Sequence, residues 1–250
     1  MGYQNLSTTA SGHKMVAPTF GAVGDIKGDR TLADITVTGY EAPEYDEEEE
    51  EWSGGAAGGQ FIVRFLTSSG TQESAYYWID DGETGPGWFA NAVGKAITGG
   101  AESIAIPAGQ ALWTRGAGYQ IVTAGEVCTS DIEFKTTTTG HVAVGNGTPV
   151  DLTLGQLAVT GYGAPVYDEE EEEYSGGAAG GEVILRLLDS TGTQTAAYYW
   201  IDDGETGPGW YANAVGKPIT GGASSVSLPA GLGLWVRGSG YNLYVPAPEL

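Results

Sequence analysis

The chain has 250 residues and carries 32 acidic but only 10 basic side chains, which gives a formal net charge of −22 and an isoelectric point near 4.1. Such a surface repels phosphate backbones and anionic lipid headgroups, so we expect no nucleic acid and no membrane partner. The single cysteine, Cys128, excludes an intramolecular disulfide, and we interpret it as an inert residue between two repeats.

The N-terminal segment lacks the basic and apolar regions of a secretion signal, and no apolar run approaches a membrane span. We therefore expect no leader, no membrane anchor and synthesis in a cytoplasm. Lys14, Met15, Val16 and Phe20 form an apolar and less acidic stretch. Close apolar contact is typical of interface cores, so this stretch is the expected docking surface for a partner protein.

Short β-rich runs separated by Gly, Pro, Asn and Asp predict an all-β fold, since no run shows helical periodicity over a helix length. Residues 76–79 are apolar or aromatic at every position, which indicates a strand covered on both faces. About seven strands per repeat suit a β-sandwich or jelly roll. In the first repeat these strands are expected at 35–38, 61–66, 74–79, around 88, 103–106, 111–115 and 119–122.

An internal repeat organises the chain. The segment AYYWIDDGETGPGW at 75–88 recurs unchanged at 197–210, an offset of 197 − 75 = 122. Residues 8–13 also resemble residues 137–141 at a slightly larger offset. We predict two tandem, homologous β-sandwich or jelly-roll-like domains, at residues 1–126 and 127–250, with an N-terminal segment in the first that the second only partly reproduces.

Each repeat contains a run of five glutamates, at 47–51 and at 169–173. Consecutive glutamates repel one another and point to alternating sides of an extended chain, so they do not converge on a small cation without a special turn. A solvated loop is the expected structure, with partner binding or weak cation binding as the alternative.

A second acidic motif, Asp-Asp-Gly-Glu, follows the aromatic strand of each repeat. Its carboxylates can supply oxygen ligands for Ca²⁺, although Asp-Gly is also an ordinary hairpin turn and the spacing is not that of an EF-hand. A turn is the default interpretation and a calcium site the alternative. The candidate ligands are Asp80, Asp81, Glu83, Asp202, Asp203 and Glu205.

Aromatic residues provide candidate contact surfaces. Trp88 and Trp210 form either a platform for sugar rings or an interface anchor, unless they belong to the core. Trp52 stands beside the acidic run and is the tryptophan expected to be exposed, with Tyr174 as its counterpart. The other four tryptophans of the repeats, Trp78, Trp113, Trp200 and Trp235, lie in apolar runs and are expected in the core.

Basic residues and histidines are few. We expect Arg64 and Arg186, in mid-strand, to pair with carboxylates. His13 and His141 are the only histidines and lie outside the closely repeated block, so no positioned base or nucleophile is recognisable. We therefore expect a protein that is not an enzyme and needs no cofactor, apart from the alternative of Ca²⁺.

The segments IPAGQALW (106–113) and LPAGLGLW (228–235), together with YYWIDDGETGPGW, resemble modules of acidic β-rich proteins of gut bacteria and their bacteriophages. The similar proteins are virion surface components, namely head decoration proteins or short head fibres. The resemblance covers both repeats and implies a duplicated β-sandwich on a virus particle; it provides no residue-level capsid-binding motif.

Two functions follow as hypotheses. The first is a structural protein of a bacteriophage virion, made in the host cytoplasm, bound to a capsid or other virion protein and assembled as a homo-oligomer. The alternative is an extracellular or cell-surface adhesin, in which a carbohydrate-binding module uses Trp88 and Trp210 with weak Ca²⁺ sites nearby, so that two equal sites give avidity for a glycan.

Overall fold

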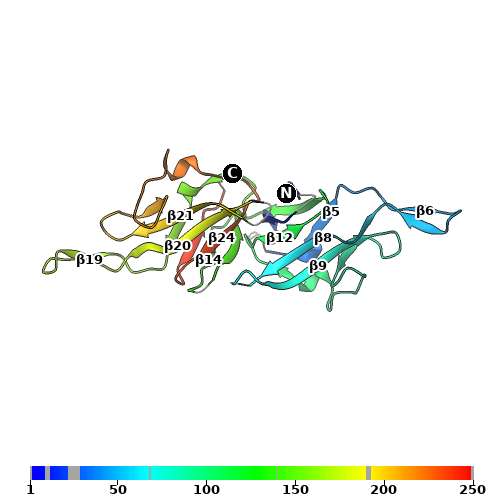
Figure 1. Cartoon of the computed structure of the whole chain (residues 1–250), viewed down its shortest axis with the longest axis horizontal. Coiled ribbons are helices and arrows are strands. Elements are labelled where there is room, and N and C mark those ends of the chain that lie inside the picture. The colour runs from blue at the N-terminus through cyan, green and yellow to red at the C-terminus, as the bar shows by residue number, and fades with distance from the viewer. Residues whose placement is uncertain are drawn as a thin grey trace.

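The computed structural model describes residues 2–8, 12–21, 29–67, 69–138, 140–189 and 193–248. The fold is all-β, as predicted, and the only helices in these residues are four 3₁₀ helices of three residues each. The molecule is elongated, with the two repeats side by side and both chain termini near its middle (Figure 1). Apart from two isolated bridges described below, every strand pair joins strands within residues 2–127, the first repeat, or within 132–245, the second repeat.

The first repeat is a sandwich of two main sheets. One sheet has the order β10 (Gly87–Phe89), β9 (Gln72–Asp80), β8 (Ala56–Leu66), β12 (Leu112–Arg115), β2 (Lys14–Val16). The other pairs β13 (Gln120–Val127) with β1 (Gly2–Ser7), β3 (Phe20–Gly21) and β5 (Ile35–Thr38). Smaller elements are β4 (Arg30–Thr31) with β11 (Ala105–Ile106), the hairpin β6 (Glu44–Asp46) with β7 (Glu51–Ser53), η1 (Leu32–Asp34) and η2 (Ala101–Ser103).

The second repeat has the same plan. Its five-stranded sheet has the order β15 (Val142–Gly145), β24 (Gly233–Arg237), β20 (Ala178–Leu188), β21 (Gln194–Asp202), β22 (Gly209–Tyr211). The facing sheet is β14 (Ile132–Lys135), β25 (Asn242–Val245), β17 (Ala158–Thr160). The smaller elements are β16 (Leu152–Thr153) with β23 (Ser227–Leu228), the hairpin β18 (Val166–Asp168) with β19 (Glu173–Ser175), η3 (Leu154–Gln156) and η4 (Ala223–Ser225).

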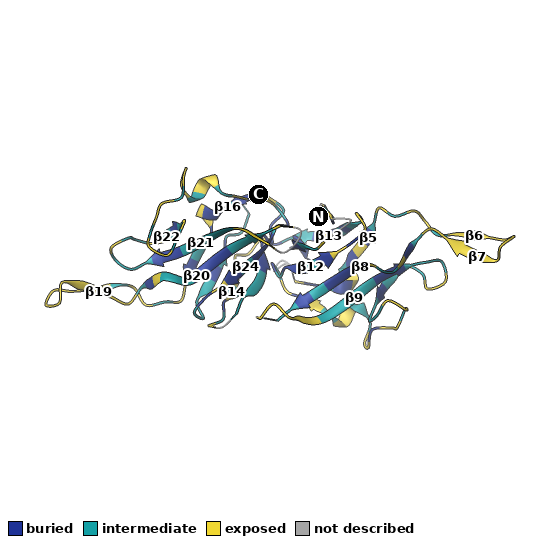
Figure 2. Ribbon diagram, in the orientation of Figure 1, coloured by how far each residue is buried: buried dark blue, intermediate teal, exposed yellow. Residues whose placement is uncertain are grey.

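Each sandwich encloses its own apolar core. In the first repeat, Phe61 and Val63 of β8 point inward and pack with Ile35 and Ile121 of the facing sheet. The second repeat buries the corresponding side chains. Burial is concentrated on the inner faces of the large sheets, whereas the strands of the two acidic hairpins are exposed (Figure 2). The alternation of side chains in a strand leaves Ile62, Arg64 and Leu66 on the outer face of β8.

The N-terminal segment does not form a free docking surface, contrary to the sequence-based expectation. Val16 in β2 is fully buried, and Met15 and Phe20 are also buried. Met15 packs between the repeats, and Phe20 belongs to β3, which pairs with β13. Lys14 is half-buried and pairs with Thr114 of β12. These side chains complete the fold, because the outer strands of both sheets are drawn from this segment.

The second repeat also has counterparts of the first two strands. Val16 pairs with Leu112 in β12, and Val144 pairs with Leu234 in β24. The offset between the repeats is therefore 144 − 16 = 128 for the edge strands β2 and β15, and 234 − 112 = 122 for their partners β12 and β24. The strand pairing changes from one repeat to the other between Val127 and Ile132, and the domain boundary at 126/127 stays a prediction.

The two repeats meet through a pseudo-twofold contact. Val16 forms a β-bridge with Leu232, and its counterpart Val144 forms the same bridge with Gln110. The next residues extend the contact, because the Ala17 N–H donates to the Gly231 carbonyl at 2.9 Å and the Gly145 N–H to the Gly109 carbonyl at 2.9 Å. The Pro-Ala-Gly turns, highlighted by the sequence resemblance, therefore join the repeats.

Ala17 and Gly145 occupy equivalent positions and face each other across this contact. A Cβ atom added to Gly145 would overlap the Ala17 methyl group and lie 2.5 Å from the Leu232 carbonyl oxygen. Ala17 is fully buried. The contact therefore has room for one methyl group and not for two.

We predict that Gly145→Ala lowers the free energy of unfolding by about 1–3 kcal/mol, the usual cost of overpacking. The double variant Ala17→Gly/Gly145→Ala restores a single methyl group and is expected to regain part of this loss, because the overlap with the Leu232 carbonyl persists. Urea denaturation of the wild type and both variants measures this. Equal free energies of unfolding for Gly145→Ala and the wild type would show that Ala17 and Gly145 are not in close contact.

Candidate functional site

A row of three side chains crosses the outer face of each five-stranded sheet, where the repeats face each other. In the first repeat, Trp113 of β12 stands opposite Arg64 of β8 on one side and Met15 of β2 on the other. In the second repeat, Trp235 has Arg186 and Ala143 as its neighbours. Side chains directly opposite each other in a sheet are in contact range, so each indole lies beside a guanidinium group.

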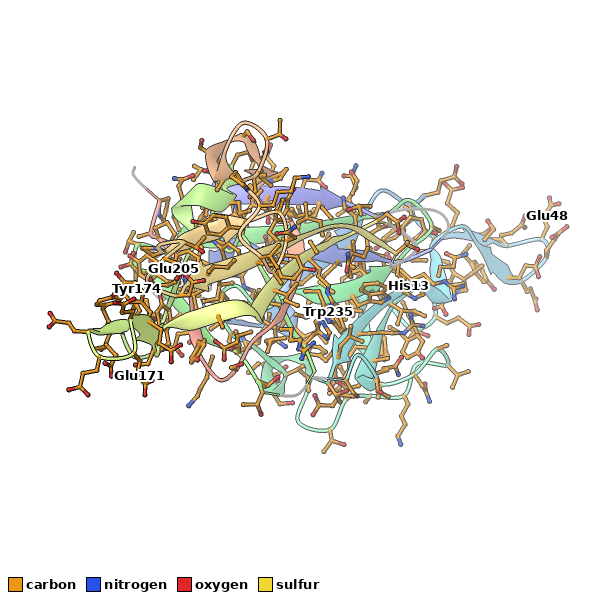
Figure 3. All side chains as sticks on the ribbon, turned by 60° about the vertical axis from the view of Figure 1, so that its left-hand side comes forward. His13, Glu48, Glu171, Tyr174, Glu205 and Trp235 are labelled. Carbon is orange, nitrogen blue, oxygen red and sulfur yellow. The ribbon has the colours of Figure 1, made fainter. Side chains whose placement is uncertain are left out.

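The arginine and the tryptophan of each row line a cleft between the repeats, with a volume of about 560 Å³. The lining consists largely of equivalent pairs, and among the described residues no acidic side chain belongs to it. The lining residues are His13, Arg64, Leu66, Gly70, Gln72, Trp113, Arg186, Leu188, Gln194 and Trp235. His13 and Trp235 appear near the middle of the molecule in Figure 3. A smaller cavity of about 250 Å³ contains His141 and shares Leu66 with the cleft.

Each arginine donates to the imidazole of its own repeat. Arg64 Nη1 contacts His13 Nε2, and Arg186 Nη1 lies 2.7 Å from His141 Nε2. An arginine only donates, so each Nε2 atom must be unprotonated. The imidazoles also lie against the indoles, with ring centroids 5.6 Å apart for His13–Trp113 and 5.4 Å apart for His141–Trp235. In the part of the chain that the structure describes, Arg64 and Arg186 thus contact histidines where carboxylate partners were expected.

Burial and nearby cations keep both histidines neutral. Burial is the largest cause that lowers the pKa of His13, followed by Arg64 and Arg115. For His141, burial followed by Arg186 and Arg237 lowers the pKa to about 4. At neutral pH the positive charge of the cleft is therefore that of its arginines.

Trp88 and Trp210 are not surface residues, so the expectation that they bind a partner is wrong. Their exposed fractions are 8% and 5%, and they pack edge-on against Trp78 and Trp200. Each indole N–H donates to a backbone carbonyl of the facing layer, that of Ile35 or that of Leu157. By contrast Trp113 and Trp235, expected in the core, are half-buried and line the cleft.

The Asp-Asp-Gly-Glu loops use their carboxylates internally. The Tyr40 hydroxyl donates to Asp80 at 3.0 Å and accepts from the Trp78 indole N–H, and the second repeat repeats this network with Asp202. Asp81 and Asp203 accept from backbone N–H groups of their own loops, those of Thr84, Glu205 and Thr206.

These backbone hydrogen bonds lower the pKa of Asp203. Glu83 and Glu205 are exposed. No three His, Cys, Asp or Glu side chains come together as a metal site anywhere in the described residues. Calcium binding stays a prediction, one that these contacts do not favour.

The acidic runs are exposed to solvent, as predicted, and they form the turns of two β-hairpins where a flexible loop was expected. Residues 44–53 and 166–175 project at opposite ends of the molecule, where Glu48 and Glu171 mark the tips in Figure 3. Trp52 is 40% exposed and Tyr174 41% exposed, as predicted. They form ring pairs with Tyr45 and Tyr167, at centroid distances of 5.2 and 5.0 Å.

The paired histidines are the functional feature that sequence reasoning missed. Their ring contacts with Trp113 and Trp235 depend on the pairing of β2 with β12 and of β15 with β24, strands that are far apart in the sequence, so no linear motif reveals them. One signal was present: residues 8–13 and 137–141 match at an offset of 141 − 13 = 128, the offset of strands β2 and β15.

Comparison of the chain with protein-family models, with curated proteins and with solved structures finds no match. In the described residues no helix is long and apolar enough to cross a membrane.

The neutral histidines generate a pH prediction. The folded-state pKa of His141 is below its ordinary value of 6.5, so as pH falls the unfolded chain takes up a proton first. The neutral, buried His141 therefore contributes to the free energy of unfolding above pH 6.5, and this contribution is lost as the pH falls toward 4. The stability advantage of wild type over His141→Gln should therefore shrink across this window.

Proton NMR resolves this directly, because the chain has only two histidines. We expect both imidazoles to titrate below pH 6.5, and we expect Arg186→Gln to raise the pKa of His141 only partly, since burial is the larger cause. A His141 that titrates at 6.5 in the folded protein would contradict the assigned contact.

Proposed function

We infer that this chain is a non-enzymatic structural protein of a bacteriophage particle, displayed on the capsid or on a fibre. The observation that supports this most is the pair of equally built acidic hairpins at opposite ends of one molecule (Figure 3). Two equal contact arms on a joined pair of sandwiches suit a protein that bridges or decorates repeated subunits.

The hairpins have a defined orientation. A Cβ atom at Gly82 would overlap the Trp52 ring, and one at Gly204 would overlap the Tyr174 ring, so each aromatic ring lies directly on the glycine of an Asp-Asp-Gly loop. Rings that are half exposed and already ordered lose little entropy on binding. They are therefore suitable anchors for a partner.

The negative charge of the hairpins favours a partner with a basic surface. One hairpin carries seven acidic residues between positions 44 and 53, and the other carries six between positions 166 and 175. Such arms favour a basic surface on a capsid or other virion protein and speed its encounter. The same repulsion argues against contact between two hairpins, so copies in a homo-oligomer would meet through other surfaces.

The alternative of a surface adhesin receives less support. Its proposed aromatic platform, Trp88 and Trp210, is in the core. Its calcium loops use Asp80 and Asp81 to order neighbouring groups. A glycan-binding role would need a different aromatic surface.

Mass spectrometry of particles purified from the source culture tests the proposal. We expect the chain at high copy number in the particles, and absence from particles with recovery from the medium or cell surface would contradict it. In a rebinding assay on particles stripped of this protein, replacing residues 46–51 and 168–173 by Asn-Gly turns should weaken binding at least tenfold. Variants that lack one hairpin are the matched controls and should be intermediate.

The packing of Trp52 on Gly82 gives a further prediction. Gly82→Ala should displace Trp52 and increase cleavage of the first hairpin by a glutamyl endopeptidase several-fold, because local opening exposes the backbone. Gly85→Ala is the matched control, since Gly85 also has a positive φ angle (72°, against 85° for Gly82) but nothing within 4 Å of an added Cβ. Equal cleavage rates in the two variants would show that the ring does not fix the hairpin.

A further inference from the structure

The cleft between the repeats combines positive charge with the absence of carboxylates. Arg64 and Arg186 line it, and no acidic side chain among the residues that the structure describes does. Arg64 and Arg186 are half-buried. Solvent screens charges in such a position less than those of an open surface, and low-dielectric walls focus the field. In a protein of charge −22, this is a place where an anion meets favourable charge.

Both guanidinium groups have unused donors. The Nη1 atoms donate to His13 and His141, but neither Nε atom has a hydrogen-bond partner in the described part of the chain, although both are shielded from solvent. Because both Nε atoms are shielded from solvent, an anion in the cleft would meet the terminal Nη atoms, which carry four of the five N–H donors of a guanidinium group. Guanidinium groups match the planar geometry of a carboxylate and bind it through charge-assisted hydrogen bonds.

The remaining lining suits a flat or apolar body attached to that anion. Trp113 and Trp235 present half-buried indoles, and Leu66 and Leu188 add aliphatic surface. Gln72 and Gln194 are exposed at the cleft and offer amide groups to polar substituents. The volume of about 560 Å³ is in the range of small-molecule sites.

We propose that the cleft between the repeats binds a ring-bearing carboxylate, with the carboxylate on Arg64 and Arg186 and the ring on Trp113 and Trp235. Two sources share this chemistry: an acidic sugar residue and an aromatic acid. The site is separate from the end hairpins, so this proposal does not depend on the particle function.

The test is NMR titration of the full chain with glucuronate, benzoate, glucose and acetate. We expect saturable shifts of the His13, Trp113 and Trp235 ring signals with glucuronate or with benzoate, and which of the two binds more tightly identifies the source. Glucose lacks the charge and acetate lacks the ring, so each should bind at least tenfold more weakly. If neither ring carboxylate produces saturable shifts, the proposal is wrong.

Variants locate the site. Arg64→Gln and Arg186→Gln should each weaken binding about tenfold, the loss expected for one charge-assisted contact. Lys95→Gln and Lys217→Gln remove the same charge at exposed, equivalent positions outside the cleft and should leave binding unchanged. Binding that survives the arginine changes, or that falls equally in the lysine controls, overturns the proposal.

A second pair of variants guards against loss of fold in the arginine variants. Gln72→Glu and Gln194→Glu change exposed residues without altering the arginine–histidine contacts. The added negative charge should abolish carboxylate binding by repulsion. Undiminished affinity in both glutamate variants would also overturn the proposal.

Discussion

The contact of Ala17 with Gly145 is the constraint on which the arrangement of the repeats depends. Equivalent residues meet at a twofold axis, so any symmetric pair must place a side chain against its own copy. Here the space holds one methyl group, and an alanine stands opposite a glycine. Two alanines would overlap and two glycines would leave a gap. The repeats are thus complementary as an unequal pair, which favours their association within one chain over pairing of identical repeats.

The charge distribution follows from that arrangement. Thirteen of the 32 acidic residues lie in the end hairpins, at opposite ends of the molecule, which relieves their mutual repulsion (Figure 3). Joining the repeats by their outer sheet faces brings Arg64 and Arg186 together at the middle. Each arginine is then next to a histidine that burial keeps neutral, so the two histidines add no further positive charge to a half-buried space.

The sequence was sufficient for the all-β class and for most strands, because alternation and turn residues act locally. Residues 35–38 form β5 as predicted, whereas the expected strand at 103–106 is split by η2 into a 3₁₀ turn and a two-residue strand. Errors arose where burial depends on the other repeat. Met15 looked like a free docking residue and Trp113 like core, because the surface that covers the first and leaves the second half-exposed belongs to distant residues.

Residues that are identical in the two repeats can be identical because the fold needs them or because both copies contribute to one binding surface. Much of the identical segment 75–88 is held by internal contacts in both copies, such as the Trp78–Tyr40–Asp80 network and its counterpart, so folding alone accounts for it. The cleft is different. Its Arg, Trp, Leu and Gln pairs are identical, while neighbouring positions differ, with Thr67 against Asp189 and Glu73 against Thr195. The leucine and tryptophan pairs also pack against Met15, Ala17 and Ala111, so the contact between the repeats accounts for them. The arginine and glutamine pairs make no such apolar contact, and their presence in both repeats is the feature that binding would explain.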